Sequence, residues 1–309
     1  MNILLIAPLS RFKTCISKNR VQLIKFLSSY PNIFFYDDAP NNNFNQYMLY
    51  LNKKNIKIDI VLYYLLYNTK DTYSVNKTFL KNYPLKKKVC FIEDFHYTDD
   101  YEDFIKKYNF DLLLLPVHQK KLIGEFKLLY NIDIDVWGFY HDTRLFRPMI
   151  AKKEYDVLLY GCLHQKIYPL RYKISIVLKF LKKKYKILVV PFNGYTQKGR
   201  SNYHLLPQLI VKSKYVIATS SIYDMFVKKY QEILLCGSKI IGDIPTGYED
   251  TLKGHIKVIE KYDGYQTIFN KIVKYLDEDY EFTDIDQTFK FQKKYGFKKS
   301  YKHLINILS

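Results

Sequence analysis

Short apolar runs alternate along the chain with longer stretches of helical periodicity. In the first half the apolar runs lie at Asn2–Ala7, Asn32–Tyr36, Ile58–Tyr64, Lys88–Ile92, Asp111–Leu115 and Ile132–Val136. The helical stretches between them lie at Asn19–Ser29, Phe44–Lys53, Asp100–Lys107 and Gln119–Tyr130. Short runs that are apolar on both faces are typical of parallel strands covered by helices.

The same alternation restarts after residue 155. Strands are predicted at Asp156–Tyr160, Lys186–Val190, Tyr215–Thr219, Lys239–Gly242 and Ile256–Glu260. Helices are predicted at Pro169–Lys183, His204–Lys212, Met225–Leu235 and Gly264–Leu276. This order implies doubly wound sheets with right-handed crossovers, and 309 residues suit two domains. We expect an α/β fold of two Rossmann-like domains, over residues 1–140 and 141–295, with a last amphipathic helix over 296–309.

The amino-acid composition indicates the compartment in which the protein works. Apolar residues make up 48% of the chain, yet no apolar run reaches the roughly 18 residues that span a bilayer. The start, MNILLIAPL, lacks a basic leader and predicts a buried strand rather than a signal peptide. The cysteines are widely spaced, at Cys15, Cys90, Cys162 and Cys236, with no CxxC pair. This spacing favours free thiols in a reducing, cytoplasmic compartment over disulfides or a zinc site.

The formal net charge of +19 has two interpretations. A basic surface can bind nucleic acid, an anionic membrane or phosphorylated ligands. The chain is also rich in Lys, Asn, Ile and Tyr, whose codons are AT-rich, and its lysines are spread over the whole length. We favour composition as the main cause, and an anionic surface partner stays open.

The segment from Lys228 to Pro245, KKYQEILLCGSKIIGDIP, combines a short helix, a turn at Gly237 and a buried strand. Glu232 lies inside the helix among apolar neighbours, where a carboxylate is poorly placed for solvent. One carboxylate can accept a hydrogen bond from each hydroxyl of a ribose diol. Glu232 is therefore a candidate for holding the ribose of a nucleotide.

This segment resembles the donor-site element of nucleotide-sugar glycosyltransferases with the GT-B fold. The resemblance is to CgeB-like proteins and to the group 1, retaining glycosyltransferases. It rests on Lys229, Glu232, the Cys236-Gly237 turn and the strand Ser238–Asp243. The segment Trp137–Pro148 resembles the segment that joins their two domains, through Gly138, Asp142, Phe146 and Pro148.

The resemblance implies an architecture and a donor. Residues 1–140 would bind the acceptor, and residues 141–295 would bind the nucleotide sugar, with a deep cleft between the two domains. The helix over 296–309 would pack back on the first domain. The donor would be a nucleoside-diphosphate sugar, with UDP-sugar slightly preferred, and no metal or other cofactor would be obligatory. Transfer would retain the anomeric configuration.

The resemblance also suggests residues that hold the donor. Gly161 follows a strand and would let the backbone approach the phosphates, and Arg171 would be a bidentate diphosphate partner. Arg171 can equally be a helix-surface residue. Lys229 stands where CgeB-like proteins usually carry arginine.

A further helix start is expected near Ser221, Tyr223 and Asp224, where free N–H groups suit a diphosphate. Asp224 precedes Glu232 by eight positions, like the first of two glutamates in many retaining members, which lies near the sugar. It can instead be an ordinary helix cap.

Acceptor-side candidates follow the strands of the first half. Asp94 and His96 come after a buried strand, at the sheet edge where ligands bind, and could orient or deprotonate an acceptor hydroxyl. His118 follows the next strand. Lys13 and Arg20 could contact phosphate, although the loop after the first strand lacks the glycines that many relatives carry there.

Other functions compete with glycosyl transfer. Asp133-Ile134-Asp135 has the form of a metal-binding Asp-x-Asp, but its aspartates alternate with isoleucines as in a strand. A GT-B scaffold without activity and a DNA-base glucosyltransferase are the alternatives. We expect a cytoplasmic, metal-independent glycosyltransferase whose acceptor is a glycan, glycolipid or protein. Nucleic acid and a peripheral anionic membrane are less favoured partners.

Overall fold

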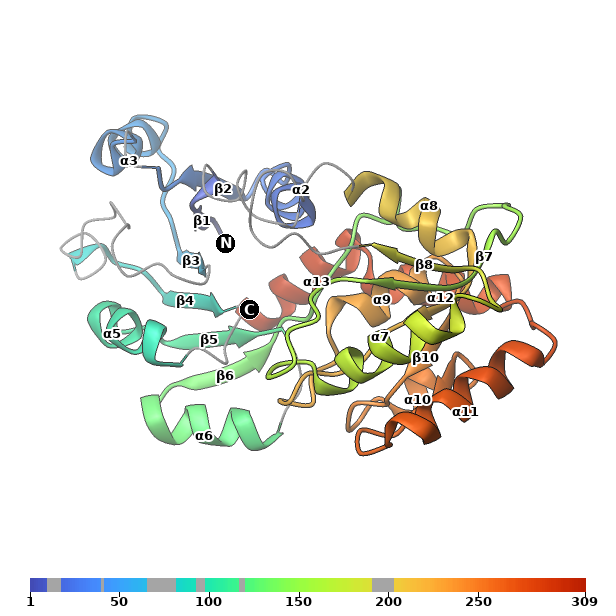
Figure 1. Ribbon diagram of the computed structural model, residues 1–309. Coiled ribbons are helices and arrows are strands. Elements are labelled where there is room, and N and C mark those ends of the chain that lie inside the picture. Colours follow the sequence, from blue (N-terminus) through green and yellow to red (C-terminus); the bar gives the residue numbers. More distant parts are fainter. Residues whose placement is uncertain (10–17, 40–41, 66–81, 93–97, 117–119, 191–202) are drawn as a thin grey trace. The chain divides into compact units, whose positions relative to one another are not determined.

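The chain forms two compact units, each built on a parallel sheet (Figure 1). The computed structural model describes residues 1–309 except 10–17, 40–41, 66–81, 93–97, 117–119 and 191–202. One unit comprises Met1–Phe139 with Ser300–Ser309, and the other comprises Tyr140–Lys299. Among the described helices, none is long and apolar enough to cross a membrane.

The first unit contains a 6-stranded sheet in the order β2-β1-β3-β4-β5-β6. Its strands are β1 (Ile3–Ala7), β2 (Ile33–Asp37), β3 (Ile60–Leu65), β4 (Lys87–Ile92), β5 (Leu112–Leu115) and β6 (Asp133–Val136). All neighbouring pairs are parallel. The order is that of flavodoxin-like sheets with one more strand, and the winding reverses at β1.

Helices supply the layers on this sheet. They are α2 (Lys18–Leu27), α3 (Phe44–Lys53), α5 (Thr98–Tyr108), α6 (Lys120–Tyr130) and the greater part of α13 (Phe297–Leu308). Adjacent residues of a strand face opposite sides, and on β3 Tyr63 packs against Tyr108 of α5, whereas Tyr64 packs against Trp137. The indole N–H of Trp137 donates to the carbonyl oxygen of Ser300 at 3.1 Å. This hydrogen bond holds the first turn of α13, at Ser300, against the rest of the first unit.

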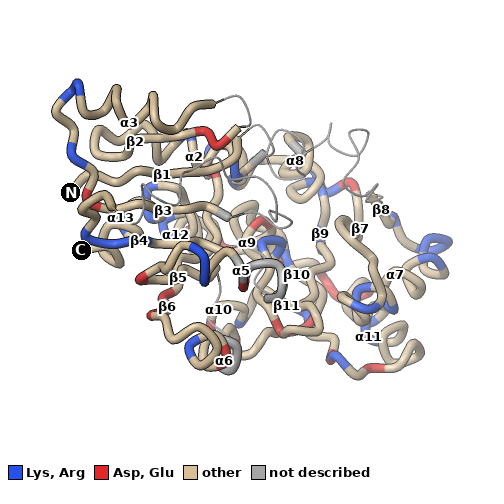
Figure 2. Tube along the Cα trace, turned by 90° about the vertical axis from the view of Figure 1, so that its left-hand side faces the viewer, with Lys and Arg blue, Asp and Glu red and all other residues tan. Residues whose placement is uncertain are grey.

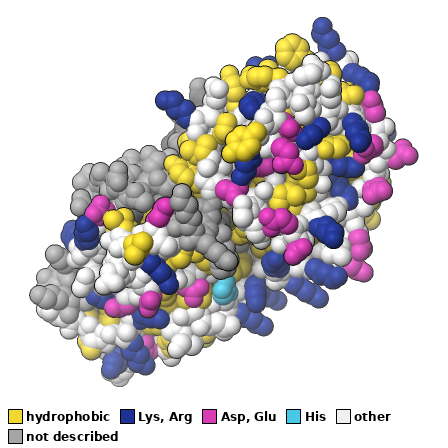
Figure 3. Space-filling model, turned by 90° about the horizontal axis from the view of Figure 1, so that it is seen from below, with side chains coloured by type: hydrophobic (Ala, Val, Ile, Leu, Met, Phe, Trp, Pro, Cys, Tyr) yellow, Lys and Arg dark blue, Asp and Glu magenta, His cyan; other side chains and the backbone are white. Residues whose placement is uncertain are grey.

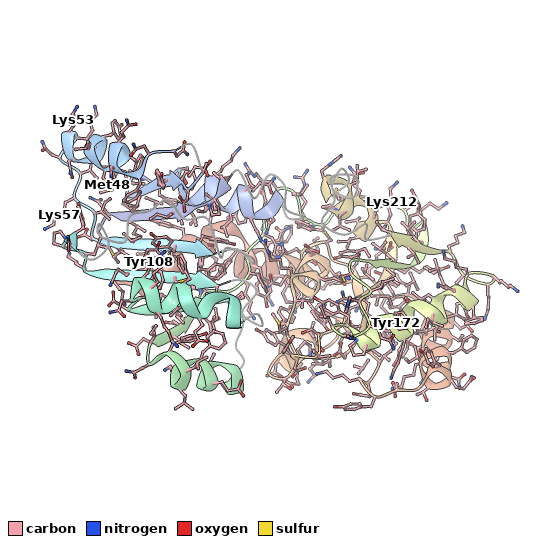
Figure 4. The ribbon with its side chains drawn as sticks, turned by 60° about the vertical axis from the view of Figure 1, so that its left-hand side comes forward. Met48, Lys53, Lys57, Tyr108, Tyr172 and Lys212 are labelled. Atoms are coloured by element: carbon pink, nitrogen blue, oxygen red, sulfur yellow. The ribbon has the colours of Figure 1, made fainter. Side chains whose placement is uncertain are left out.

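Two lysines at the end of α3 and just after it are exposed. Figure 4 shows Lys53, at the end of α3, and Lys57, just after it, pointing away from the sheet. Met48 of the same helix and Tyr108 are buried. The amphipathic pattern of α3 thus has its apolar side on the sheet.

The second unit contains a 5-stranded sheet in the order β11-β10-β9-β7-β8. Its strands are β7 (Tyr155–Tyr160), β8 (Ile187–Val190), β9 (Ser213–Ile217), β10 (Lys239–Gly242) and β11 (Ile256–Val258), all paired in parallel. This is the flavodoxin-like order. Since β8 and β9 lie on opposite sides of β7, the topological switch point falls between β7 and β9.

Alternate residues of β7 define the two cores of this unit. Leu158 and Tyr160 pack in one core with α8, α9 and α12, whereas Val157 and Leu159 pack in the other with α7 and α11. The helices are α7 (Pro169–Leu181), α8 (Leu206–Val211), α9 (Lys228–Leu235), α10 (Glu249–Leu252), α11 (Tyr265–Asp277) and α12 (Ile285–Tyr295), with a short 3₁₀ turn at Tyr203–Leu205. Helices on both faces explain why the strands read as continuous apolar runs.

The predicted α/β fold with two doubly wound sheets is confirmed, and every predicted strand is present to within a few residues. One helix differs. The helix predicted over Met225–Leu235, with its start near Asp224, begins at Lys228. Asp224 has a left-handed backbone, at φ 55°, and is not a helix cap. The helices α10 and α12 were not predicted.

Candidate functional site

The loops at the carboxyl ends of β7 and β9 are joined by one buried arginine. In open α/β sheets, ligands bind at this edge, beside the switch point. Arg171 of α7 donates from Nη1 to the carbonyl of Cys162 at 3.1 Å and from Nη2 to the carbonyl of Thr219 at 2.9 Å. Its side chain is 3% exposed, so the helix-surface alternative is wrong. The guanidinium lies 3.9 Å from the ring centre of Tyr168.

Lys229 lies beside Arg171, next to Gly161. Its ammonium group donates to the carbonyl oxygen of Tyr160 and lies 4.3 Å from the centre of the Tyr160 ring. Gly161 has φ +88°, and a Cβ there would lie 2.9 Å from Lys229 Nζ and 3.9 Å from Arg171 Nη1. A side chain at position 161 would therefore occupy the space in front of both cations.

These two cations lack a direct counter-charge. Neither Arg171 nor Lys229 forms an ion pair with a carboxylate in the part of the chain that the structure describes. Burial lowers the pKa of Arg171. Burial, and next the neighbouring Arg171, hold the pKa of Lys229 well below its usual value. A buried charge is strongly unfavourable unless it is paired, so this arrangement favours binding of an anion.

Glu232 is held by the same tyrosine. The Tyr160 hydroxyl donates to Glu232 Oε2 at 2.7 Å, and Oε1 has no hydrogen-bond partner among the described residues. Burial raises the pKa of Glu232, against the opposing effects of Tyr160 and Lys229. Glu232 as a whole is 6% exposed, and its second carboxylate oxygen can accept from a ligand hydroxyl.

The end of α9 sets the direction of β10. Gly237 has φ +72°, and its N–H donates to Leu234 O at 3.2 Å while the N–H of Ser238 donates to Ile233 O at 3.3 Å. This is a Schellman motif, which requires a left-handed residue. The predicted turn at Cys236-Gly237 is thus confirmed as the exit from the helix that carries Lys229 and Glu232.

A second polar group, which the sequence analysis missed, fixes the loop after β9. Asp243, just after β10, accepts from the backbone N–H of Ser220 at 2.8 Å and also from its hydroxyl. The hydroxyl of Tyr230, on α9, donates to Asp243 Oδ1 at 3.0 Å. The signal in the sequence was the position of Asp243 at the carboxyl end of a predicted strand.

The structure places Asp224 apart from Glu232, with no hydrogen bond between them. Asp224 accepts from the N–H of Thr246 at 3.1 Å and pairs with the ammonium of Lys261. Burial would raise the pKa of Asp224, but the hydrogen bonds from Lys261 and Thr246 outweigh burial and lower it. Asp224 therefore stays ionised at neutral pH. Its partners follow β10 and β11 along the chain, so Asp224 lies at that part of the sheet edge.

Ser221 and Tyr223 lie in the loop between β9 and α9. The N–H of Tyr223 donates to Ser221 Oγ at 3.2 Å. The helix start predicted at Ser221 to Asp224 is wrong, because α9 begins at Lys228. A contact between this loop and a diphosphate stays a prediction. The N–H groups at the true helix start belong to Lys228 and Lys229.

The acceptor-side candidates Asp94, His96 and His118, as well as Lys13, lie outside the described residues. Arg20 is partly exposed on α2. Asp133 and Asp135 have exposed side chains on the edge strand β6. Among the residues whose structure is described, no group of three or more His, Cys, Asp or Glu gathers as a metal site.

Solved structures with the same fold cover the whole chain. Sucrose-phosphate synthase from Thermosynechococcus elongatus matches with a TM-score of 0.60 at 9% identity, over 100% of this chain and 98% of that one. Anabaena HepE in complex with UDP and glucose matches with a TM-score of 0.60 at 10% identity, over 100% and 99%. A glycosyltransferase from Rickettsia africae matches with a TM-score of 0.56 at 11% identity, over 99% and 97%.

The chain has the GT-B fold. Identity this low establishes the fold, and a fold alone does not fix an activity. No protein-family model matches the chain, and a search of curated proteins finds no match. The narrower resemblance to CgeB-like proteins therefore stays a prediction.

Proposed function

We propose that the protein transfers a sugar from a nucleoside-diphosphate sugar to a hydroxyl group of an acceptor. The observation that carries this proposal is the buried pair Arg171 and Lys229, which lies at the switch-point edge without a carboxylate partner among the described residues. A diphosphate would supply the missing negative charge, and Gly161 leaves room for it. An arginine offers a rigid set of donors to phosphate oxygens, and a lysine adds a point charge.

The remaining donor contacts would come from residues at the same edge of the sheet. Glu232 Oε1 would accept from the ribose hydroxyls, with Tyr160 holding the carboxylate in place. Ser221 and Tyr223 would contribute from the neighbouring loop. UDP-sugar is the preferred donor, because the HepE structures that share this fold are complexes with UDP, UDP and glucose, or UDP-glucose.

The chemistry requires stabilisation of the leaving diphosphate. The bond between the anomeric carbon and the diphosphate oxygen breaks, a bond to the acceptor oxygen forms, and the acceptor proton passes to a base. Arg171 and Lys229 would neutralise the charge that develops on the diphosphate, which is the main electrostatic demand of the reaction. With these cations in place we propose metal-independent transfer. We propose further that Asp224 lies near the sugar and that Asp94 or His96 acts as the base. Transfer would retain the anomeric configuration.

The test is a calorimetric and thermal-shift screen of the full chain against UDP, GDP, UDP-glucose and UDP-N-acetylglucosamine. A donor present at about 100 times its Kd would add about 2.7 kcal/mol of stability, which is readily detected. The variant Arg171→Met should lose this shift. The exposed Lys182→Met, at the end of α7, serves as a control for the lost charge. If no nucleotide stabilises the native protein, the catalytic proposal fails and an inactive GT-B scaffold takes its place.

A further inference from the structure

A cavity of about 670 Å³ lies in the second unit at the amino end of its sheet. The residues that line it include Lys239, Lys253, His255, Phe282, Phe291 and Lys294. Lys239 is the first residue of β10, and His255 directly precedes β11. Arg171 and Lys229 belong to the opposite, carboxyl edge, so the cavity is a separate site. Its volume falls in the range of small-molecule sites, about 300–1,000 Å³.

Three lysines and two aspartates line the cavity, so its lining is basic by one charge. Lys239 donates to the carbonyl of Gly254 at 2.7 Å, and Lys294 makes a long contact of 3.4 Å with the Thr251 hydroxyl. Within the described residues, neither these lysines nor Lys253 forms an ion pair. Two aspartates also line the cavity, Asp250 and Asp284. Asp284 accepts from the N–H of Asp286 at 3.0 Å and caps α12, where the positive end of the helix offsets part of its charge.

One wall combines an aromatic surface with an unsatisfied polar atom. His255 is 9% exposed, and its ring packs edge-on against Phe291 with centres 5.0 Å apart. Its Nδ1 has no hydrogen-bond partner among the described residues. Phe282 is 72% exposed at the same cavity. A large exposed ring beside unpaired lysines suits a ligand that has both a flat apolar part and an anionic group.

We propose that this cavity binds a small organic phosphate that carries a flat ring, of the nucleoside monophosphate class. The lysines Lys253 and Lys294 would contact the phosphate, and Phe282 would cover the ring. A phosphate monoester carries up to two negative charges, which matches two or three lysine ammonium groups. This site is independent of the proposed transfer reaction, because it shares no residue with the donor site.

The experiment measures UMP binding by calorimetry to the full chain that carries Arg171→Met, which disables the proposed donor site and leaves the cavity unchanged. We expect the double variant Lys253→Gln, Lys294→Gln to lose at least tenfold in UMP affinity. The double variant Lys182→Gln, Lys183→Gln removes the same charge from exposed positions after α7 and should bind like the native protein. Equal losses in both double variants would show unspecific attraction and overturn the proposal, as would unchanged binding in the first variant.

A second variant tests the ring. Phe282→Ser should weaken UMP severalfold and leave binding of inorganic phosphate unchanged, because Phe282 is exposed and contributes no phosphate contact. Glucose 6-phosphate should bind no better than inorganic phosphate. If it binds as tightly as UMP, or if Arg171→Met abolishes UMP binding, the proposed site is wrong. Folding of each variant is checked by its thermal transition without ligand.

Discussion

At the scale of single residues, Tyr160 organises the candidate donor site. Its hydroxyl holds Glu232, its carbonyl oxygen accepts from Lys229, and its ring lies beneath the same ammonium group. Two groups with opposite charges are thus placed by one residue at the end of β7. Neither link could be read from the sequence, because Tyr160 and Glu232 are 72 positions apart.

The substitution Glu232→Gln tests the ribose contact. The side-chain carbonyl of the introduced glutamine can still accept from Tyr160, so the fold should persist, but the charged acceptor for the ribose is lost. We expect donor binding to weaken by about 1.5–3 kcal/mol, the scale of a hydrogen bond to a charged group. Calorimetry with UDP-glucose and with UDP measures the change. Native-like affinity in the variant would remove Glu232 from the site.

The substitution Lys229→Met should change the stability of the fold and the affinity for the donor in different ways. Burial of this ammonium group is unfavourable, and the nearby Glu232 offsets it only in part, so its removal should leave stability unchanged or raise it by about 1–3 kcal/mol, against the lost bond to Tyr160 O. Donor affinity should fall at least tenfold. A loss of both stability and binding would instead assign Lys229 a structural role.

The difference in unfolding free energy between Lys229→Met and the native protein should change with pH in a defined direction. The folded-state pKa of Lys229 is lowered below 10.5, so the unfolded chain binds the proton more tightly. Stability of the native protein therefore rises with pH between the lowered pKa and 10.5, and the advantage of Lys229→Met shrinks there. Urea unfolding of both proteins across this pH interval measures the difference. A difference in unfolding free energy that stays constant or widens with pH would contradict burial as the cause of the lowered pKa of Lys229.

At the scale of elements, the turn between β7 and α7 brings the backbone of Gly161 close to both cations. Gly161→Ala should weaken donor binding at least tenfold, because a Cβ would displace Lys229 and fill the space in front of Arg171. Gly247→Ala is the matched control, since Gly247 also has a left-handed φ, +84°, but open space around its Cβ position. Each should lose about 1–2 kcal/mol of stability from backbone strain. Similar donor affinities in the two variants would reject the steric explanation.

The strands could be predicted because buried parallel strands carry their signal locally, as in the apolar run of β5. The start of α9 could not be predicted from the local pattern. Met225, Phe226 and Val227 continue the apolar pattern of the helix, but Asp224 is held by Lys261, 37 positions away. A tertiary contact thus overrides the local pattern. Gly161, Arg171, Lys229 and Glu232 could be found because the motif resemblance placed them on successive elements, whereas Tyr230 and Asp243 pair only in three dimensions.

At the scale of the whole molecule, the charge of +19 is dispersed. Figure 2 shows lysines and arginines along the elements of both units. In Figure 3 basic and acidic side chains are interspersed over part of the visible face, and one group of basic side chains lies at its lower edge. Several lysines are already paired, such as Lys184 with Asp277 and Lys257 with Glu278. A continuous basic surface of the kind that follows a phosphate backbone is not evident in these views of the described residues.

Metal dependence of the proposed transfer is tested on the intact protein. If Arg171 and Lys229 neutralise the diphosphate, transfer or donor hydrolysis should continue at its full rate in excess EDTA. The measurement is release of nucleoside diphosphate with and without chelator, followed by addition of Mg²⁺ or Mn²⁺. A reversible and complete loss of turnover on chelation would contradict the proposed role of the two cations.

The last prediction separates a DNA acceptor from a glycan, glycolipid or protein acceptor. Duplex DNA binding would require several lysines to contact phosphates together, and affinity would then fall by about 0.9 log units per log unit of salt for each phosphate contacted. Because the basic residues are dispersed and partly paired, we expect DNA binding to be weak and to vanish near physiological salt. Fluorescence anisotropy with a labelled duplex across a salt series measures this. Submicromolar binding at roughly physiological salt, together with sugar transfer to the duplex, would make the DNA-base glucosyltransferase the correct assignment.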